Sequence, residues 1–216
     1  MSPDIPEVVV ERLPVYARAL GQLASQGREV VSSQDLGEQL GVTPAQIRKD
    51  LSYFGRFGKQ GRGYNIRRLV EELRQILGLE REWTVVLVGV GHLGKAILHY
   101  GGFAPQGFNV VAAFDNDPET VGQTIAGLQV QDVGEMQRTL DKQPAEIGVV
   151  AVPAAQAQGI IDLLVSSGVQ AILNYAPMAA HVPPGVHVRH IDPVLSLQSM
   201  TFYVKDNNQP AAEQAQ

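Results

Sequence analysis

The spacing of apolar residues in the first eighty positions predicts four helices joined by short turns. Apolar residues recur every three or four positions in four stretches, and each stretch ends at or next to a glycine. The predicted helices cover residues 13–27, 32–41, 43–54 and 66–78. The third has the clearest start, because Thr43 is a favourable N-cap, Pro44 takes the first helical position, and Gln46 completes a capping box.

The third predicted helix has two different faces. Ile47, Leu51 and Phe54 lie at helical spacing and are expected to face inward, whereas Arg48 and Lys49 lie on the opposite face. Two short helices joined by a tight turn that contains glycine form a helix-turn-helix, whose second helix enters the major groove of DNA. The expected DNA contacts on this helix are Thr43, Ala45, Gln46, Arg48, Lys49 and Ser52. The alternative for the Gln46 side chain is that helix capping occupies it.

Residues 55–65, GRFGKQGRGYN, combine glycines with basic side chains and lack a helical pattern. They predict a tight hairpin, the wing of a winged helix, because glycine lets a backbone approach a phosphate or enter a minor groove. Lys59 and Arg62 are expected at its tip, with Gly63 beside them. Pro44–Arg68 carries seven basic residues and one acidic residue, although the whole chain has a net charge of −5. A polyanionic partner is therefore expected for this patch alone, the alternative being a solvated surface.

From residue 81 onward, short apolar runs alternate with helical stretches. The predicted strands lie within WTVVLVG, NVVAAFD, GLQVQD, EIGVVAV, VQAILNY and GVHVRHID, and the predicted helices cover residues 93–100, 133–142 and 154–167. This alternation predicts an α/β fold with a parallel, doubly wound sheet of the Rossmann type. Ligands of such sheets bind beyond the carboxyl ends of the strands.

The first of these strands runs into Gly89, Gly91 and Gly94, which have the GxGxxG spacing of a dinucleotide-binding loop. The first glycine makes the turn, the second lets a pyrophosphate approach the backbone, and the third lets the helix pack on the strand. Asp115 ends the second strand about twenty residues further on, where an acidic residue binds the ribose hydroxyls of the cofactor. No Lys or Arg adjoins Asp115, so NAD(H) is favoured over NADP(H). The alternative is a glycine turn that binds nothing.

The loops after the fourth and fifth strands are expected to border the nicotinamide half of the cofactor. The predicted cofactor contacts are Gly89, Val90, Gly91, His92, Leu93, Gly94, Asp115, Asn116, Val152, Pro153, Asn174 and Tyr175. No catalytic residues are predicted beside them, because no tyrosine has a lysine four residues later and too little chain remains for a substrate domain. The five histidines lack a suitably spaced acidic partner, so no metal site is expected.

The chain has no cysteine, no run of about 18 uncharged apolar residues, and no secretory signal pattern at its N-terminus. We therefore expect a cytoplasmic protein without disulfides or a membrane span. The last predicted helix begins with Asp192 as its N-cap and is apolar on most sides, so we expect it to be buried, preferably in a second copy of the chain. The expected domains are a DNA-binding domain at 1–80, a Rossmann domain at 81–190, a dimerisation helix at 191–205 and a disordered tail at 206–216.

From Pro6 to Val204 the chain resembles the Rex family of bacterial redox-sensing transcriptional repressors. The most specific stretches are RLPVYARAL, VSSQDLGEQLGVTPAQIRKDLSYFGRFGKQGRGYN, VVLVGVGHLGKAILHY, FDNDP, AVPAAQAQ, ILNYAP and RHIDPVLSLQSMTFYV. The resemblance implies a homodimeric winged-helix repressor that binds inverted-repeat operator DNA, is released by NADH, and exchanges its C-terminal helix with its partner. It carries GVGHLG over as the dinucleotide loop, Asp115 as the ribose ligand, and QIRKD with the wing as DNA contacts. Pro193 departs from the bulky apolar residue that the family often has after this aspartate.

Three polar residues on helices, Arg18, Tyr100 and Asp192, are expected to meet at the junction between the domains and to couple the two sites. Two alternative functions remain open from the sequence. The first is a small NAD-dependent dehydrogenase with an accessory helical domain. The second is a winged-helix regulator that senses a different nucleotide, such as a coenzyme A ester.

Overall fold

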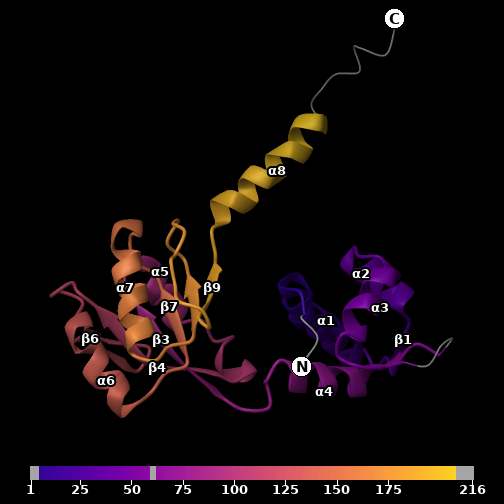
Figure 1. Ribbon diagram of the computed structural model, residues 1–216, viewed down its shortest axis with the longest axis horizontal. Coiled ribbons are helices and arrows are strands. Elements are labelled where there is room, and N and C mark those ends of the chain that lie inside the picture. The colour runs from indigo at the N-terminus through magenta and orange to yellow at the C-terminus, as the bar shows by residue number, and fades with distance from the viewer. Residues whose placement is uncertain (1–4, 59–61, 208–216) are drawn as a thin grey trace, which may run out of the picture. The chain divides into compact units, whose positions relative to one another are not determined.

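The chain divides into two compact units, Met1–Arg81 and Glu82–Gln216, here called the N-terminal and C-terminal units. The computed structural model describes residues 5–58 and 62–207 (Figure 1). Lys59 lies outside the described residues, as does the predicted tail from residue 208 onward.

The described residues of the N-terminal unit form four helices and one pair of two-residue strands. Its elements are α1 (Glu7–Ser25), β1 (Val30–Val31), α2 (Ser33–Leu40), α3 (Pro44–Ser52), β2 (Tyr64–Asn65) and α4 (Ile66–Ile76). The first helix begins at Glu7, six residues before the predicted start, with Pro14 inside it. Proline lacks an N–H and costs the helix a hydrogen bond, but burial of Val9 on one side of Pro14 and of Tyr16 on the other favours one continuous helix.

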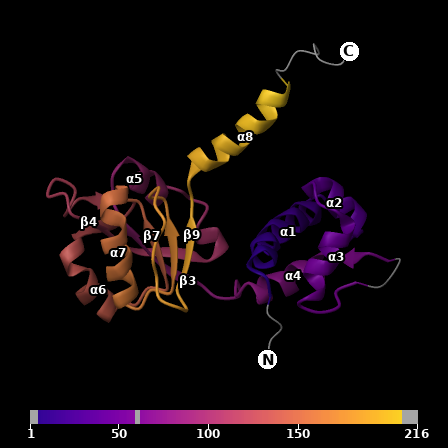
Figure 2. The same cartoon turned by 45° about the horizontal axis from the view of Figure 1, so that its top comes forward.

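The core of the N-terminal unit forms where α1 packs on α4 and α2 packs on α3 (Figure 2). All four helices contribute side chains that are almost completely buried, among them Leu13, Leu20, Leu36, Ile47, Ile66 and Leu73. The strands β1 and β2 pair antiparallel, with Val31 opposite Tyr64. The strand that leaves the predicted wing therefore pairs with residues that precede α2, which the sequence pattern did not indicate.

In the C-terminal unit, the residues up to Asn207 form a seven-stranded sheet with helices on both faces. Its strands are β3 (Trp83–Val88), β4 (Phe108–Asp115), β5 (Thr124–Ile125), β6 (Leu128–Asp132), β7 (Ile147–Val150), β8 (Ala171–Asn174) and β9 (His187–His190). Its helices are α5 (His92–Leu98), η1 (Ala104–Gln106), η2 (Val133–Glu135), α6 (Met136–Lys142), α7 (Ala154–Ser166) and α8 (Pro193–Asn207). The strand order is β5-β6-β4-β3-β7-β8-β9, and all neighbours except β5 and β6 are parallel. Without β5, this is the strand order of a dinucleotide-binding fold. The chain adds strands outward from β3 on one side and then, from β7 onward, on the other side, while β3 and β7 remain parallel.

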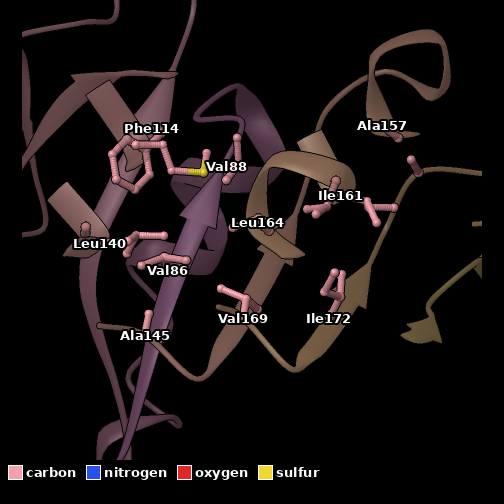
Figure 3. Close-up of a cluster of buried hydrophobic side chains, with 14 residues drawn as sticks. Val86, Val88, Phe114, Leu140, Ala145, Ala157, Ile161, Leu164, Val169 and Ile172 are labelled. Carbon is pink, nitrogen blue, oxygen red and sulfur yellow. The ribbon is translucent and has the colours of Figure 1, made fainter. Parts of the chain in front are cut away.

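Two apolar layers hold the sheet between its helices. On one face, α6 and α7 cover β3, β4, β7 and β8, with Leu140 beside Val86 and Phe114, and Ile161 and Leu164 over the next strands (Figure 3). On the other face, α5 contributes to a second buried cluster through Ile97. Because β3 and β4 are buried on both faces, they read in the sequence as continuous apolar runs rather than alternating ones.

The strand β5 was not predicted, and a strained two-residue turn connects it to β6. Ala126 has a φ of 50° and Gly127 a φ of 82°, the left-handed pair that a type I′ hairpin requires. Alanine adopts this conformation unfavourably, whereas asparagine tolerates it. Ala126→Asn is therefore expected to raise the free energy of unfolding of the C-terminal unit by roughly 1 kcal/mol in urea denaturation. The matched control is Ala155→Asn in the exposed first turn of α7, which is expected to give no gain; equal effects of the two changes would contradict this explanation.

The last helix, α8, leaves its described side chains uncovered in the single chain. Every side chain from Pro193 to Lys205 is exposed, including seven large apolar ones: Val194, Leu195, Leu197, Met200, Phe202, Tyr203 and Val204. Within residues 5–58 and 62–207, no helix is both long enough and apolar enough to cross a membrane.

Candidate functional site

The loop between β3 and α5 needs glycine at two of its positions for steric reasons. Gly89 has a φ of 94°, and a Cβ there would lie 2.5 Å from the carbonyl oxygen of Ala151 on the neighbouring strand. A Cβ on Gly94 would overlap the carbonyl oxygen of Gly89, because the first turn of α5 packs directly on the loop. These contacts bring α5 against the end of β3 more closely than any other residue type permits.

Gly91 differs from these two glycines, because a Cβ on it would meet no protein atom within 4 Å. Gly91 is the N-cap of α5 and lines a cavity of about 450 Å³ at the carboxyl ends of β3, β4 and β7. The protein itself therefore does not require glycine here. A ligand that approaches the backbone closely would require glycine here, and the pyrophosphate of a dinucleotide is such a ligand.

Asp115 ends β4 at the edge of the same cavity. Its Oδ2 accepts a hydrogen bond from the backbone N–H of Val90 at 2.6 Å, and its Oδ1 accepts from the N–H groups of Asn116 and Asp117 at 2.8 and 2.9 Å. These bonds fix the carboxylate between the glycine loop and the turn after β4. A carboxylate has about four acceptor positions, so one remains for a ribose hydroxyl.

The structure brings only part of the predicted cofactor residues to this cavity. Its lining is formed by Gly89, Gly91, Asp115, Asn116, Asp117, Thr120, Val133, Ala151, Val152, Pro153, Gln156, Gly159 and Ile160. Val90 is buried and offers only its backbone, whereas His92 and Leu93 are exposed on the first turn of α5.

Asn174 and Tyr175 do not belong to the cavity lining. The side chain of Asn174 is completely buried, where its Oδ1 accepts from the N–H of Ala176 at 3.0 Å and its Nδ2 donates to the carbonyl of Ala176 at 3.1 Å. This amide therefore closes the turn after β8. The sequence pattern missed Thr120, Gln156 and Ile160. Gln156 and Ile160 lie in the first half of α7, directly after the predicted contacts Val152 and Pro153, and Thr120 lies in the turn after β4.

The chemistry of the cavity fits the adenosine and pyrophosphate part of a dinucleotide. Gly91 leaves room for the pyrophosphate, and Asp115 lies where a ribose is bound. Asp117, whose carboxylate accepts from the backbone N–H of Glu119 and the hydroxyl of Thr120, adds a second negative charge to the lining. Two carboxylates repel a phosphate on the ribose, which favours NAD(H) over NADP(H).

In the N-terminal unit, α2 and α3 form a tight helix-turn-helix. Ser32 caps α2 through a capping box with Asp35, and Gly41 ends α2 with a φ of 67°. A Cβ on Gly37 would lie 2.5 Å from the carbonyl oxygen of Val42, so α2 touches the chain that enters α3. Thr43 caps α3 as predicted, since its Oγ1 accepts from the N–H of Gln46.

One groove of about 740 Å³ joins the exposed side of α3 to the segments on either side of residues 59–61. It is lined by Ser32, Ser33, Arg48, Leu51, Ser52, Gly55, Arg56, Phe57, Gly58, Gly63 and Tyr64. Ala45 and Lys49 are exposed beside it, and Arg48 donates to the Oγ of Ser33 at 2.9 Å. A second hollow carries Arg62 together with Arg56 and Arg68. Arg56 lines both the groove and the hollow, although it was not among the predicted DNA contacts. Its position within the basic stretch Pro44–Arg68 is the sequence signal that could have identified it.

A buried acidic residue, Asp50, ties α3 to α1. Its carboxylate accepts from the Nε and Nη2 of Arg12 at 2.6 and 2.8 Å, from the hydroxyl of Tyr16 at 2.6 Å, and from the Nε2 of Gln46 at 2.6 Å. Burial by itself raises the pKa of the Asp50 carboxyl, but the hydrogen bonds from Arg12, Tyr16 and Gln46 outweigh it and hold that pKa below its usual value. The Gln46 side chain therefore bonds to Asp50, and the expected capping box at Thr43 is formed only by its threonine half.

Of the three predicted coupling residues, one belongs to the N-terminal unit and two belong to the C-terminal unit. Arg18 is exposed on α1. Tyr100 is 62% exposed and stacks edge-on against Phe103. The carboxylate of Asp192 accepts from the N–H of Val194 at the start of α8. Among the described residues, no group of three or more His, Asp or Glu side chains is placed to hold a metal ion.

Family models match both units of the chain. Residues 4–52 match a family described as "Putative DNA-binding protein N-terminus", and residues 80–178 match a family described as "CoA binding domain". The "Redox-sensing transcriptional repressor Rex" of Roseiflexus sp. (strain RS-1) is 53% identical over 199 residues, which cover 92% of this chain and 90% of that protein. The protein of the same description from Chloroflexus aggregans (strain MD-66 / DSM 9485) is 52% identical over 96% of this chain and 98% of its own.

Solved structures of RSP, a Rex-family repressor, have the same fold. The complex of RSP with β-NAD+ and operator DNA superimposes with a TM-score of 0.88 at 35% identity and covers 94% of each chain. The complex of RSP with β-NADH gives a TM-score of 0.86 at 33% identity and covers 94% of this chain and 96% of that one.

A helix-turn-helix with a basic outer face and a dinucleotide-type cavity in one chain define the class of nucleotide-responsive transcription regulators. The identity of 53% over 92% of the sequence defines the family within that class. The chain belongs to the Rex family of redox-sensing transcriptional repressors. Its relatives are repressors, so it is a regulator rather than the small dehydrogenase that the sequence left as an alternative.

Proposed function

We propose that this chain binds inverted-repeat operator DNA as a homodimer in the cytoplasm and is released from that DNA when NADH occupies its C-terminal unit. The observation that carries the proposal is the pairing, in one chain, of the cavity at Gly91 and Asp115 with the basic groove at α3. The cofactor supplies a nicotinamide that is cationic when oxidised and neutral when reduced. The side chains of this protein bind and orient it, with Asp115 holding the ribose and the glycine loop receiving the pyrophosphate.

The DNA contacts that we propose are the exposed residues of α3 with the groove residues beside them. Gly63 lines the same groove, and its own fold requires glycine there, because its φ is 70° and a Cβ would lie 2.5 Å from the carbonyl oxygen of Val31. Arg48 and Lys49 supply positive charge for phosphate contacts. Phosphate contacts of this kind give affinity that falls steeply with salt. The remaining proposed contacts are Thr43, Ala45, Gln46, Ser52, Lys59 and Arg62.

A regulatory ligand changes DNA binding only through a difference in its affinity for two states of the protein. NADH must therefore bind the DNA-incompetent state more tightly than the competent one. A shift from 1:99 to 99:1 requires a difference of about 5.5 kcal/mol. We propose that Arg18, Tyr100 and Asp192 belong to the contacts that distinguish the two states.

The homodimer is supported by the exposure of α8. An apolar helix with every described side chain exposed is stable in water only against a partner, and a second copy of this chain is the partner that reading two half-sites requires. We propose that α8 packs on the other subunit. Sedimentation analysis of the full chain and of a chain that ends at Ile191 tests this, with a dimer expected for the first and a monomer for the second.

The proposed function is tested by titrating NADH and NAD+ against the protein bound to a duplex that it selects from a random library. At constant salt, NADH is expected to release the duplex at a lower concentration than NAD+. Equal release by the two forms, or none, contradicts the proposal.

Asp115→Ala is expected to weaken NADH binding at least about tenfold, because the ribose loses its acceptor and the glycine loop loses the bond from Val90. DNA binding without NADH is expected to remain, since Asp115 belongs to the other unit. Isothermal titration calorimetry measures the first effect and a gel shift the second. The control is Asp132→Ala, at the end of the neighbouring strand and outside the cavity lining, which is expected to leave NADH affinity unchanged.

A second ligand class is favoured by the match of residues 80–178 to a coenzyme A binding family. Coenzyme A carries a phosphate on its adenine ribose, and the carboxylates of Asp115 and Asp117 at this cavity would repel it. Competition between NADH and a coenzyme A ester, followed by NADH fluorescence, separates the two ligands. Displacement by a low concentration of the ester would favour the second class.

A further inference from the structure

The side chain of Gln46 is held in one orientation by a chemical constraint. Gln46 lies on the first turn of α3, half-buried between exposed Ala45 and buried Ile47. Its Nε2 donates to the Oδ1 of Asp50 at 2.6 Å. The ionised carboxylate has no hydrogen to donate, so only the nitrogen end of the amide can face it. The Oε1 end points away from Asp50 and accepts no hydrogen bond within residues 5–58 and 62–207.

The carboxylate of Asp50 is itself held in one orientation by other donors, so it does not rotate together with the Gln46 amide. It is completely buried, and its Oδ2 accepts from the Nε of Arg12 and the hydroxyl of Tyr16, both at 2.6 Å. The Nη2 of Arg12 shares the other oxygen with Gln46. Paired donors of a guanidinium fix the plane of a carboxylate. The amide of Gln46 is therefore anchored to α1 through Asp50 and not only to its own helix.

We propose that Asp50 is a positioning residue for base recognition, which holds Gln46 so that its Oε1 accepts a hydrogen bond from the exocyclic amino group of adenine or cytosine in the major groove. This inference rests on the proposed DNA-binding function of α3. At a given position on one strand, adenine and cytosine place an amino donor where guanine and thymine place a carbonyl oxygen. A fixed acceptor therefore prefers the first pair, whereas an amide free to rotate presents either end and loses the preference.

The test uses full-length protein and the duplex that the wild type selects from a random library. Each position of the half-site is replaced in turn by all four bases, and affinities are measured by fluorescence anisotropy at fixed salt. At one position the wild type is expected to bind adenine or cytosine at least about fivefold more tightly than guanine or thymine. Comparison of the adenine and cytosine duplexes then identifies the base.

Gln46→Met, which keeps the length of the side chain and removes its amide, is expected to abolish the preference at that position alone. Asp50→Asn is expected to reduce the same preference, and adding it to Gln46→Met is expected to change the preference no further. The preference is a ratio of two affinities measured on one protein preparation. Partial unfolding of a variant lowers both affinities by the same factor and therefore leaves their ratio unchanged. The matched control is Gln34→Met on α2, where Gln34 donates to Glu38 in the same i,i+4 arrangement at 2.8 Å. This control is expected to keep the preference.

Two results would overturn the inference. The first is a Gln46→Met protein that retains the wild-type preference at every position. The second is an Asp50→Asn protein that binds all duplexes, random ones included, more weakly by one common factor, since that result assigns Asp50 a purely structural role. Failure of the proposed function is distinct, because it appears as wild-type DNA affinity that does not respond to NADH while the base preference is still measured.

Discussion

Asp50→Ala is expected to lower the free energy of unfolding of the N-terminal unit by about 3–5 kcal/mol, because it breaks a buried ion pair from one side. Arg12, whose side chain is only 25% exposed, loses its partner, and the buried hydroxyl of Tyr16 loses its acceptor. Urea unfolding followed by circular dichroism measures the loss. NADH binding in the C-terminal unit, which forms its own core, is expected to persist and shows that this unit remains folded.

The control for Asp50→Ala is an ion pair of the same charge type on the surface. Arg68 and Glu72 are four residues apart on α4, with side chains 74% and 37% exposed and an N–O distance of 3.7 Å. Glu72→Ala is expected to cost less than about 0.5 kcal/mol. Equal losses for the two variants would show that burial of the Asp50 carboxylate contributes nothing to stability.

The same cluster predicts the direction of the pH dependence. The folded-state pKa of Asp50 lies below its usual value, so its stabilisation is complete above the usual carboxyl pKa and is lost as the pH falls through the folded value. Wild-type stability is therefore expected to decrease in acid more steeply than that of Asp50→Asn. Melting temperatures of both proteins between neutral and acidic pH measure the difference, and parallel curves would contradict the assignment.

The elements that could be predicted from the sequence are those whose signals are local. Thr43, Pro44 and Gly41 mark the turn and the start of α3 within a few residues, and the glycine loop follows an apolar run that is continuous because both faces of β3 are buried. The missed strands β1, β2 and β5 have only two residues each, too short for any periodicity. The start of α1 was also missed, since a proline such as Pro14 is favoured at the first position of a helix. Pro14 is tolerated inside α1 because tertiary packing continues on both sides of it.

The binding sites divide in the same way. That Gly91 and Asp115 lie at one cavity could be predicted, because the positions of the loop and of the strand end are set by spacing along the chain. Their contact with a cofactor stays a prediction. The bond between Arg12 and Asp50 joins residues 38 positions apart, and an aspartate on a basic helix reads in the sequence as a surface charge. Asn174 is the opposite case, because a polar residue at the end of a parallel strand predicts a ligand contact. In the structure, its side-chain amide forms hydrogen bonds with the backbone of Ala176 in the turn that follows. Side-chain partners across elements carry no spacing signal.

Gly91→Ala is expected to weaken NADH binding at least about tenfold and to leave the stability of the free C-terminal unit nearly unchanged. The free protein accommodates the new methyl group, because a Cβ at this position meets no protein atom within 4 Å. At the proposed site the cofactor would not, since its pyrophosphate is expected to approach the backbone through this opening. Calorimetric titration with NADH and urea unfolding without it measure the two quantities on the same preparation.

Gly94→Ala provides the contrast three residues further on. Its Cβ would overlap the carbonyl oxygen of Gly89, so α5 must move away from the loop before any ligand arrives, and the C-terminal unit is expected to lose roughly 1–3 kcal/mol of stability. Gly91→Ala is therefore expected to lower NADH affinity without lowering the free energy of unfolding. Gly94→Ala is expected to lower the free energy of unfolding even in the absence of NADH. If Gly91→Ala bound NADH as tightly as the wild type while Gly94→Ala was destabilised, the glycine spacing would reflect helix packing alone, and the cofactor would have to bind elsewhere in the unit.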